Sequence, residues 1–310
     1  MAGVSELVTR ALEGQRRAIA RLISLVEDGG EELAEAMHEL YPHTGRAYTI
    51  GITGAPGSGK STLTERLVAR IRADERSVGV LAIDPSSPFS GGALLGDRVR
   101  MQSHALDSGV FIRSMATRGH LGGLSLATPE AVRVLDAVGK DIIVIETVGV
   151  GQAEVEITDA CDTTLVVLNP GWGDAVQTAK AGLMEIADVF VVNKADRPGV
   201  RDTVREIRQM LDMSDAEHKP AVVQTVATKD EGFDDLWTAV GKHRAWQEEK
   251  GLLESRRRRR IEREIKEIVA ERFRRRVETE GAEQLASLTD EVVARRCNPY
   301  QAADRLVQGL

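Results

Sequence analysis

Residues 54–61 combine glycines, a lysine and a serine in an order that can bind the phosphates of a nucleotide. The segment lies between an expected strand and an expected helix and reads Gly54-Ala55-Pro56-Gly57-Ser58-Gly59-Lys60-Ser61, with Thr62 next. Its glycines leave room for backbone N–H groups to surround phosphate oxygens, while Lys60 brings a positive charge and Ser61 offers a hydroxyl to Mg²⁺. A flexible glycine turn is the alternative, but the strand-loop-helix context favours a phosphate site.

A second polar segment, Asn193-Lys194-Ala195-Asp196, follows an apolar run that predicts a strand. Guanine presents two donors, N1–H and the N2 amine, that one aspartate carboxylate can accept together, whereas adenine presents no such pair. A buried Asp196 left without partners would disfavour the wrong base. Alone the segment could be a surface turn; beside the phosphate loop it predicts guanine recognition by Asn193, Lys194 and Asp196. A weaker candidate for backbone contact with the base comprises Val226, Ala227 and Thr228.

Three carboxylates at or beyond expected strand ends could hold or position a metal ion. Glu146 ends an apolar run and could bind Mg²⁺ through water, and the N–H of Gly149 could contact a γ-phosphate. Asp84 ends another run, and Asp97 follows in the glycine-rich loop beyond it. Both are candidates for the metal site or for positioning water, although Asp84 could simply begin a turn. Val150 stands where many small GTPases have a water-orienting glutamine, which predicts slow hydrolysis.

The composition argues against several other functions. A formal net charge of −7 disfavours general nucleic-acid binding, and no apolar stretch approaches the roughly 18 residues that span a bilayer. We therefore expect a cytoplasmic protein without nucleic-acid or membrane partners. The 6 histidines form no close cluster, and Cys161 and Cys297 match no metal or redox spacing, which predicts no zinc or nickel site. The basic run 256–260 is either an anion-binding patch or, as we favour, a solvated helix face.

Short apolar runs alternate with helical stretches between residues 48 and 244, which predicts an α/β fold with a mostly parallel sheet flanked by helices. The expected strands cover residues 48–53, 78–83, 110–113, 141–145, 163–168, 189–192 and 221–226. Ligands of such sheets bind beyond the carboxyl ends of the strands, where the polar segments should lie. We expect a P-loop GTPase domain over residues 47–245, with helical extensions over 1–46 and 246–310.

Both extensions show helical periodicity. In the first, apolar residues recur every three or four positions until Gly29 and Gly30, which predicts one helix, and a second short helix follows up to Leu40. Beyond residue 245, a long charged helix carries an apolar stripe that must be covered by its own domain or by a second subunit. The stripe consists of Ile261, Ile265, Ile268, Val269, Phe273 and Val277.

Residues 48–245 resemble the MeaB/ArgK family, the G-protein chaperones of adenosylcobalamin-dependent methylmalonyl-CoA mutase and its relatives. The most specific string is Glu146-Thr-Val-Gly-Val-Gly-Gln152. Ordinary GTPases have an aspartate and an alanine in the corresponding string. The resemblance is also carried by Ile83-Asp-Pro-Ser-Ser87, Leu95-Gly-Asp-Arg98, residues 117–123 with paired Gly122 and Gly123, and Asn193-Lys-Ala-Asp196.

The resemblance implies a P-loop NTPase fold of the SIMIBI-like type that binds GTP or GDP with Mg²⁺ and hydrolyses GTP slowly. It assigns Lys60 and Ser61 to the phosphates and Mg²⁺, with Lys60, Asp84 and Glu146 as the catalytic candidates. The metal and switch residues would be Ser61, Asp84, Asp97 and Glu146.

By the same resemblance, the partner is an adenosylcobalamin-dependent acyl-CoA mutase, and the chain forms a homodimer through residues 246–310. An extra switch segment maps onto residues 171–180, where Gln177 and Lys180 fit the family and Trp172 departs from its usual small residue. Two alternatives share the core fold. A metal-insertion GTPase would usually display cysteine or histidine clusters, and a transport-associated ATPase or kinase would need adenine recognition.

Overall fold

The computed structural model describes residues 3–85, 102–104, 106–117, 127–147, 153–171, 185–214 and 217–309. The chain forms two compact units, Met1–Arg257 and Arg258–Leu310. None of the described helices combines the length and the apolar composition needed to cross a membrane.

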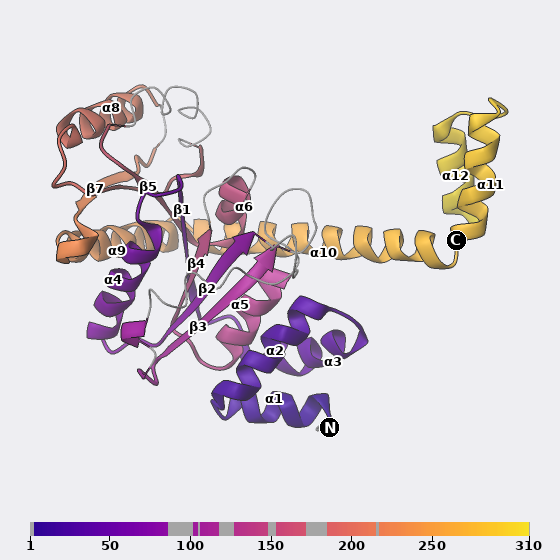
Figure 1. Ribbon diagram of the computed structural model, residues 1–310, viewed down its shortest axis with the longest axis horizontal. Coiled ribbons are helices and arrows are strands. Elements are labelled where there is room, and N and C mark those ends of the chain that lie inside the picture. The colour runs from indigo at the N-terminus through magenta and orange to yellow at the C-terminus, as the bar shows by residue number, and fades with distance from the viewer. Residues whose placement is uncertain are drawn as a thin grey trace. The chain divides into compact units, whose positions relative to one another are not determined.

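The first unit is built on one parallel sheet of 7 strands in the order β3-β2-β4-β1-β5-β6-β7 (Figure 1). The strands are β1 (Tyr48–Gly54), β2 (Val78–Pro85), β3 (Val110–Thr117), β4 (Ile142–Thr147), β5 (Thr163–Leu168), β6 (Val189–Asn193) and β7 (Ala221–Thr225). Each corresponds to one of the apolar runs, so the predicted strands and their parallel arrangement are confirmed. Every residue of β1, β4, β5 and β6 is buried. This explains why apolar and polar residues do not alternate along these strands, since both of their faces are covered.

Helices cover both faces of the sheet. One face packs against α4 (Lys60–Ala73) and α9 (Phe233–Glu249). The other packs against α5 (Ala127–Ala137), α6 (Ala153–Ala160) and α8 (Val200–Asp212). Short 3₁₀ turns lie at Tyr41–His43, Gln102–His104 and Ala227–Lys229. The helices therefore leave the carboxyl ends of the strands to the connecting loops.

The N-terminal extension contains three helices where the sequence predicted two. They are α1 (Val4–Leu12), α2 (Arg16–Asp28) and α3 (Glu31–Leu40), and α2 and α3 pack against α5 (Figure 1). The prediction of one helix up to Gly29 was wrong because Gly14 lies between α1 and α2 with a φ of 82°. A glycine adopts this left-handed conformation without steric cost, so the chain turns there although the apolar spacing continues.

The start of α10 (Leu252–Thr279) carries the first two arginines of the basic run, which we had interpreted as a solvated face. Arg257 Nη2 lies 2.7 Å from Asp162 Oδ2, and the Asp162 side chain is 0% exposed. Arg256 Nη1 lies 3.0 Å from Asp188 Oδ2. Both carboxylates also accept backbone N–H groups, from Thr49 and Thr164. For these two arginines the interpretation was wrong, because they neutralise carboxylates just before β5 and β6.

The second unit comprises the rest of α10 with α11 (Ala282–Val293) and α12 (Pro299–Gly309). Its small core contains Leu288, Ala302 and Leu306. The long charged helix is confirmed. Its stripe residues at spacings of four remain exposed: Ile261, Ile265, Val269 and Phe273.

Replacing Arg257 with alanine should destabilise the first unit, because the buried carboxylate of Asp162 would lose its guanidinium. We expect the free energy of unfolding to fall by about 3 kcal/mol, the lower end for breaking a buried ion pair, since the Arg257 side chain is 30% exposed. Urea unfolding followed by circular dichroism measures this change. Arg17→Ala, at an exposed position of α2, is the control and should change stability by less than about 0.5 kcal/mol. Equal effects of the two substitutions would contradict the assignment.

Candidate nucleotide-binding site

The loop of residues 54–61 connects β1 to α4 in a path that only glycine permits at two points. Gly54 has a φ of 135°, and a Cβ there would lie 2.1 Å from the carbonyl oxygen of Val167 on neighbouring β5. Gly59 has a φ of 92°, and a Cβ there would lie 2.5 Å from Nδ2 of Asn193. The loop is therefore packed directly against the ends of β5 and β6.

Lys60 begins α4 and folds back over this loop. Its Nζ donates hydrogen bonds to the carbonyl oxygens of Gly54, at 2.7 Å, and Ala55, at 3.0 Å, and the residue is 7% exposed. The ammonium group thus lies at the N-terminus of a helix, whose unpaired N–H groups also favour an anion. This arrangement concentrates positive charge where the predicted phosphates would bind.

Ser61 in the first turn of α4 lies close to Glu146 in β4, because β1, which leads into α4, pairs with β4. β1 and β4 pair in parallel with Ile52 opposite Glu146, and the Ser61 Oγ donates a 2.6 Å hydrogen bond to the Glu146 Oε1. Both residues are buried, at 8% and 4% exposure. A hydroxyl and a carboxylate are oxygen ligands of the kind that Mg²⁺ prefers, so this pair fits the predicted metal.

The Asn193 side chain joins three loops. Its Nδ2 donates to the carbonyl oxygen of Ser58 at 2.8 Å, and its Oδ1 accepts from the Thr225 Oγ1 and the Ala227 N–H, each at 3.2 Å. Lys194, at the unusual φ of 58°, donates from Nζ to the Gly57 carbonyl at 2.6 Å. The segment 193–196, the stretch after β7 and the phosphate loop are thus held together.

Asp196 differs from the expectation of a buried carboxylate. Its side chain is 39% exposed and lies 3.1 Å from the Lys229 Nζ. The hydrogen bond from Lys229 lowers the pKa of Asp196 below its ordinary value, so the group is an ionised acceptor at neutral pH. The expectation of burial was wrong, and Lys229 was missed as its partner. Its position directly after the stretch 226–228 is the only sequence signal for it.

Other predicted site residues cannot be placed in the same way. Asp84 lies in β2 by its backbone, but its side chain is outside the described residues. Asp97, Gly149 and Val150 also lie outside them, as do residues 172–180 of the expected switch segment. Among the described residues, no three His, Cys, Asp or Glu side chains are grouped closely enough to hold a metal ion.

Comparison with known proteins points to one family. The family described as "Methylmalonyl Co-A mutase-associated GTPase MeaB" matches residues 19–282. A protein of Pyrococcus abyssi is 50% identical over 311 residues, covering 98% of this chain and 96% of its own. GTPase ArgK of Escherichia coli is 34% identical over 77% of this chain and 75% of its own. A crystal structure of a LAO/AO transport system kinase has the same fold, with a TM-score of 0.71, 24% identity, and coverage of 98% and 96% of the two chains.

Gly59→Ala should weaken binding of guanine nucleotides, because the new methyl group would displace the Asn193 amide and strain the backbone. We expect the GDP affinity measured by calorimetry to fall by about tenfold or more. Gly241→Ala is a matched control, since a Cβ at Gly241 in α9 meets nothing within 4 Å. An unchanged affinity in Gly59→Ala would contradict the contact between the two loops.

Proposed function

Because the chain belongs to the family of methylmalonyl-CoA mutase-associated GTPases, we propose that it binds and hydrolyses GTP to gate cofactor loading and protection of an adenosylcobalamin-dependent acyl-CoA mutase. The observation that carries the nucleotide part is the Asn193 side chain, which joins the phosphate loop to the stretch 226–228. The mutase part rests on the family description.

The phosphates would bind on the backbone N–H groups of residues 54–62, with Lys60 exchanging its carbonyl partners for phosphate oxygens. The base would lie against Asn193 and Lys194, with the Asp196 carboxylate accepting the N1–H and N2 amine of guanine. Val226, Ala227 and Thr228 would bound the base from the other side. Lys229 would pair with the Asp196 carboxylate while leaving it partly exposed to the base.

Ser61 and Glu146 would hold Mg²⁺, with Asp84 and Asp97 as further candidates. When bound, the ion would neutralise charge on the β and γ phosphates and so favour hydrolysis. Gly149 would contact the γ-phosphate. Val150 cannot orient a water molecule, so we propose that turnover by the isolated chain is slow, below about 1 s⁻¹.

We further propose that the chain acts as a cytoplasmic homodimer. The exposed stripe on α10 supports a subunit contact, because Ile261, Ile265, Val269 and Phe273 form one apolar row that water would otherwise cover. The alternatives are a metal-insertion GTPase and a transport-associated ATPase or kinase. A preference for guanine over adenine nucleotides would distinguish our proposal from the transport-associated ATPase or kinase.

Calorimetry with GTP and ATP tests the base assignment. We expect ATP to bind at least about a hundredfold more weakly than GTP, because adenine cannot donate two hydrogen bonds to Asp196. Asp196→Asn should shift the preference towards xanthine nucleotides, since the amide donates to the carbonyl that xanthine has in place of the amine. Equal affinities for ATP and GTP in the wild-type protein would refute guanine recognition.

GTP turnover with and without a cobalamin-dependent mutase tests the chaperone role. Partner binding and nucleotide binding must influence each other equally, so the mutase should change nucleotide affinity or accelerate hydrolysis. Gln177→Ala or Lys180→Ala should weaken this coupling more than GTP binding. If neither turnover nor mutase cofactor occupancy responds with any cobalamin-dependent mutase of the source organism, the chaperone role fails and the GTPase role survives.

A further inference from the structure

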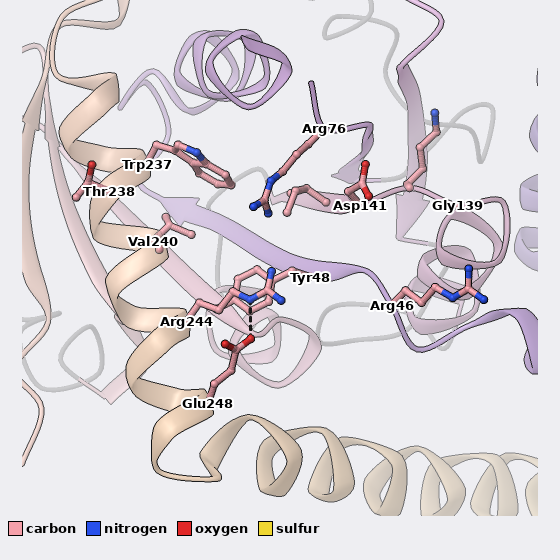
Figure 2. Close-up of a pocket in the computed structure, with 13 residues that line it drawn as sticks. Arg46, Tyr48, Arg76, Gly139, Asp141, Trp237, Thr238, Val240, Arg244 and Glu248 are labelled. Atoms are coloured by element: carbon pink, nitrogen blue, oxygen red, sulfur yellow. Dashed lines mark hydrogen bonds and ion pairs between the residues drawn. The ribbon is translucent and has the colours of Figure 1, made fainter. Parts of the chain in front are cut away.

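A cavity of about 740 Å³ lies at the amino ends of the strands. It is lined by residues at or just before the starts of β1, β2 and β4, and by one side of α9 between Trp237 and Glu248 (Figure 2). Its size falls in the range of small-molecule sites, roughly 300–1,000 Å³.

The cavity is distinct from the nucleotide site. β1 runs from Tyr48, which lines the cavity, to Gly54, which begins the phosphate loop. At about 3.3 Å per residue, these two ends of the strand lie roughly 20 Å apart. Parallel α/β sheets bind their usual ligands at the carboxyl ends, so the fold itself does not account for a charged cavity here.

Four basic side chains line the cavity, namely Arg46, Arg76, Lys140 and Arg244. Its two carboxylates are already engaged. Glu248 pairs with Arg244 at 2.7 Å (Figure 2), and Asp141 accepts hydrogen bonds of 2.7 Å from both the N–H and the Oγ of Ser77. The cavity is therefore positive overall.

Three of these cations form no ion pair with a described carboxylate. Within the described part of the chain, no ion pair involves Arg46, Arg76 or Lys140. The Lys140 Nζ donates only to the Gly109 carbonyl, at 3.2 Å. Burial, and then the charges of Arg16 and Arg72, lower the pKa of Lys140 below its ordinary value, although the nearby carboxylates of Asp107 and Asp141 act in the opposite direction. An anion in the cavity would stabilise this charged ammonium group.

Aromatic rings position two of the arginines. The Arg76 guanidinium lies over the Trp237 ring, 5.9 Å from its centre, and the Arg244 guanidinium lies over Tyr48 at 4.8 Å (Figure 2). The Trp237 Nε1 donates to Asp74 at 2.7 Å, which orients the indole. A guanidinium held on a ring keeps its N–H donors available for a planar or tetrahedral anion.

We propose that this cavity binds a small organic anion carrying phosphate groups. Arginine forks and a lysine ammonium are the side chains that recognise phosphate, and three of them form no ion pair within the described part of the chain. The half-buried indole of Trp237 supplies apolar surface for the organic part. The site is independent of the proposed GTP hydrolysis.

The experiment uses the full chain saturated with GDP and Mg²⁺, so that the nucleotide site is occupied. Inorganic pyrophosphate and ADP are titrated by calorimetry with Mg²⁺ in excess. We expect saturable binding of both without release of GDP, with ADP the tighter because it carries an organic part. Binding that only displaces GDP, or no saturable binding of either probe, would overturn the proposal. So would binding of a hexaglutamate peptide in place of both probes, since that would indicate a protein segment.

Arg76→Ala and Lys140→Ala should each weaken ADP binding by about tenfold or more, as expected for loss of one charge-assisted contact. Lys140→Arg should retain most of the affinity. Arg21→Ala, an exposed arginine of α2 that does not line the cavity, should leave it unchanged. GDP affinity should be unchanged in every variant, which verifies folding. Equal ADP affinity in Arg76→Ala, Lys140→Ala and Arg21→Ala would overturn the assignment.

Discussion

The amide of Asn193 is the contact on which the rest of the site depends. This side chain donates to the loop after β1 and accepts from two groups at and beyond the end of β7. It therefore connects the loops that follow β1, β6 and β7. A nucleotide needs its phosphates and its base held at a fixed separation. Because the amide of a buried residue uses both its donor and its acceptor here, moving either loop would leave polar groups without partners. The chain thus carries the geometry of the site before a ligand binds.

The parallel sheet determines where each kind of chemistry can occur. Because the central strands are buried, the polar side chains lie at the ends of the sheet. The carboxyl and amino ends carry different sets of charged residues. At the carboxyl end lie Lys60, Ser61 and Glu146. At the amino end, Asp162 and Asp188 receive the arginines of α10, while Arg76 and Lys140 line a separate cavity. Helix α9 begins at Phe233, after the stretch 226–228, and several of its residues between Trp237 and Glu248 line that cavity.

Local pattern was sufficient for much of this structure. All seven strands were predicted from apolar runs. The loops 54–61 and 193–196 were singled out by residue type and position at strand ends, and the structure places them in contact. The break at Gly14 was missed because periodicity reports the buried face and not the backbone path. The contacts of Arg257 with Asp162 and of Asp196 with Lys229 join residues distant in sequence, and only the packed fold brings them together. The proposed mutase partner comes from the family resemblance alone, because no local sequence pattern indicates it.

Phosphate release from GTP in a single turnover, as Mg²⁺ is titrated from zero, tests most directly the claim that Lys60, Ser61 and Glu146 form a GTPase centre. The account predicts slow release, below about 1 s⁻¹, that requires Mg²⁺ and falls by at least about a hundredfold in Lys60→Ala. Release that is independent of Mg²⁺, or that proceeds at the wild-type rate in Lys60→Ala, would contradict it.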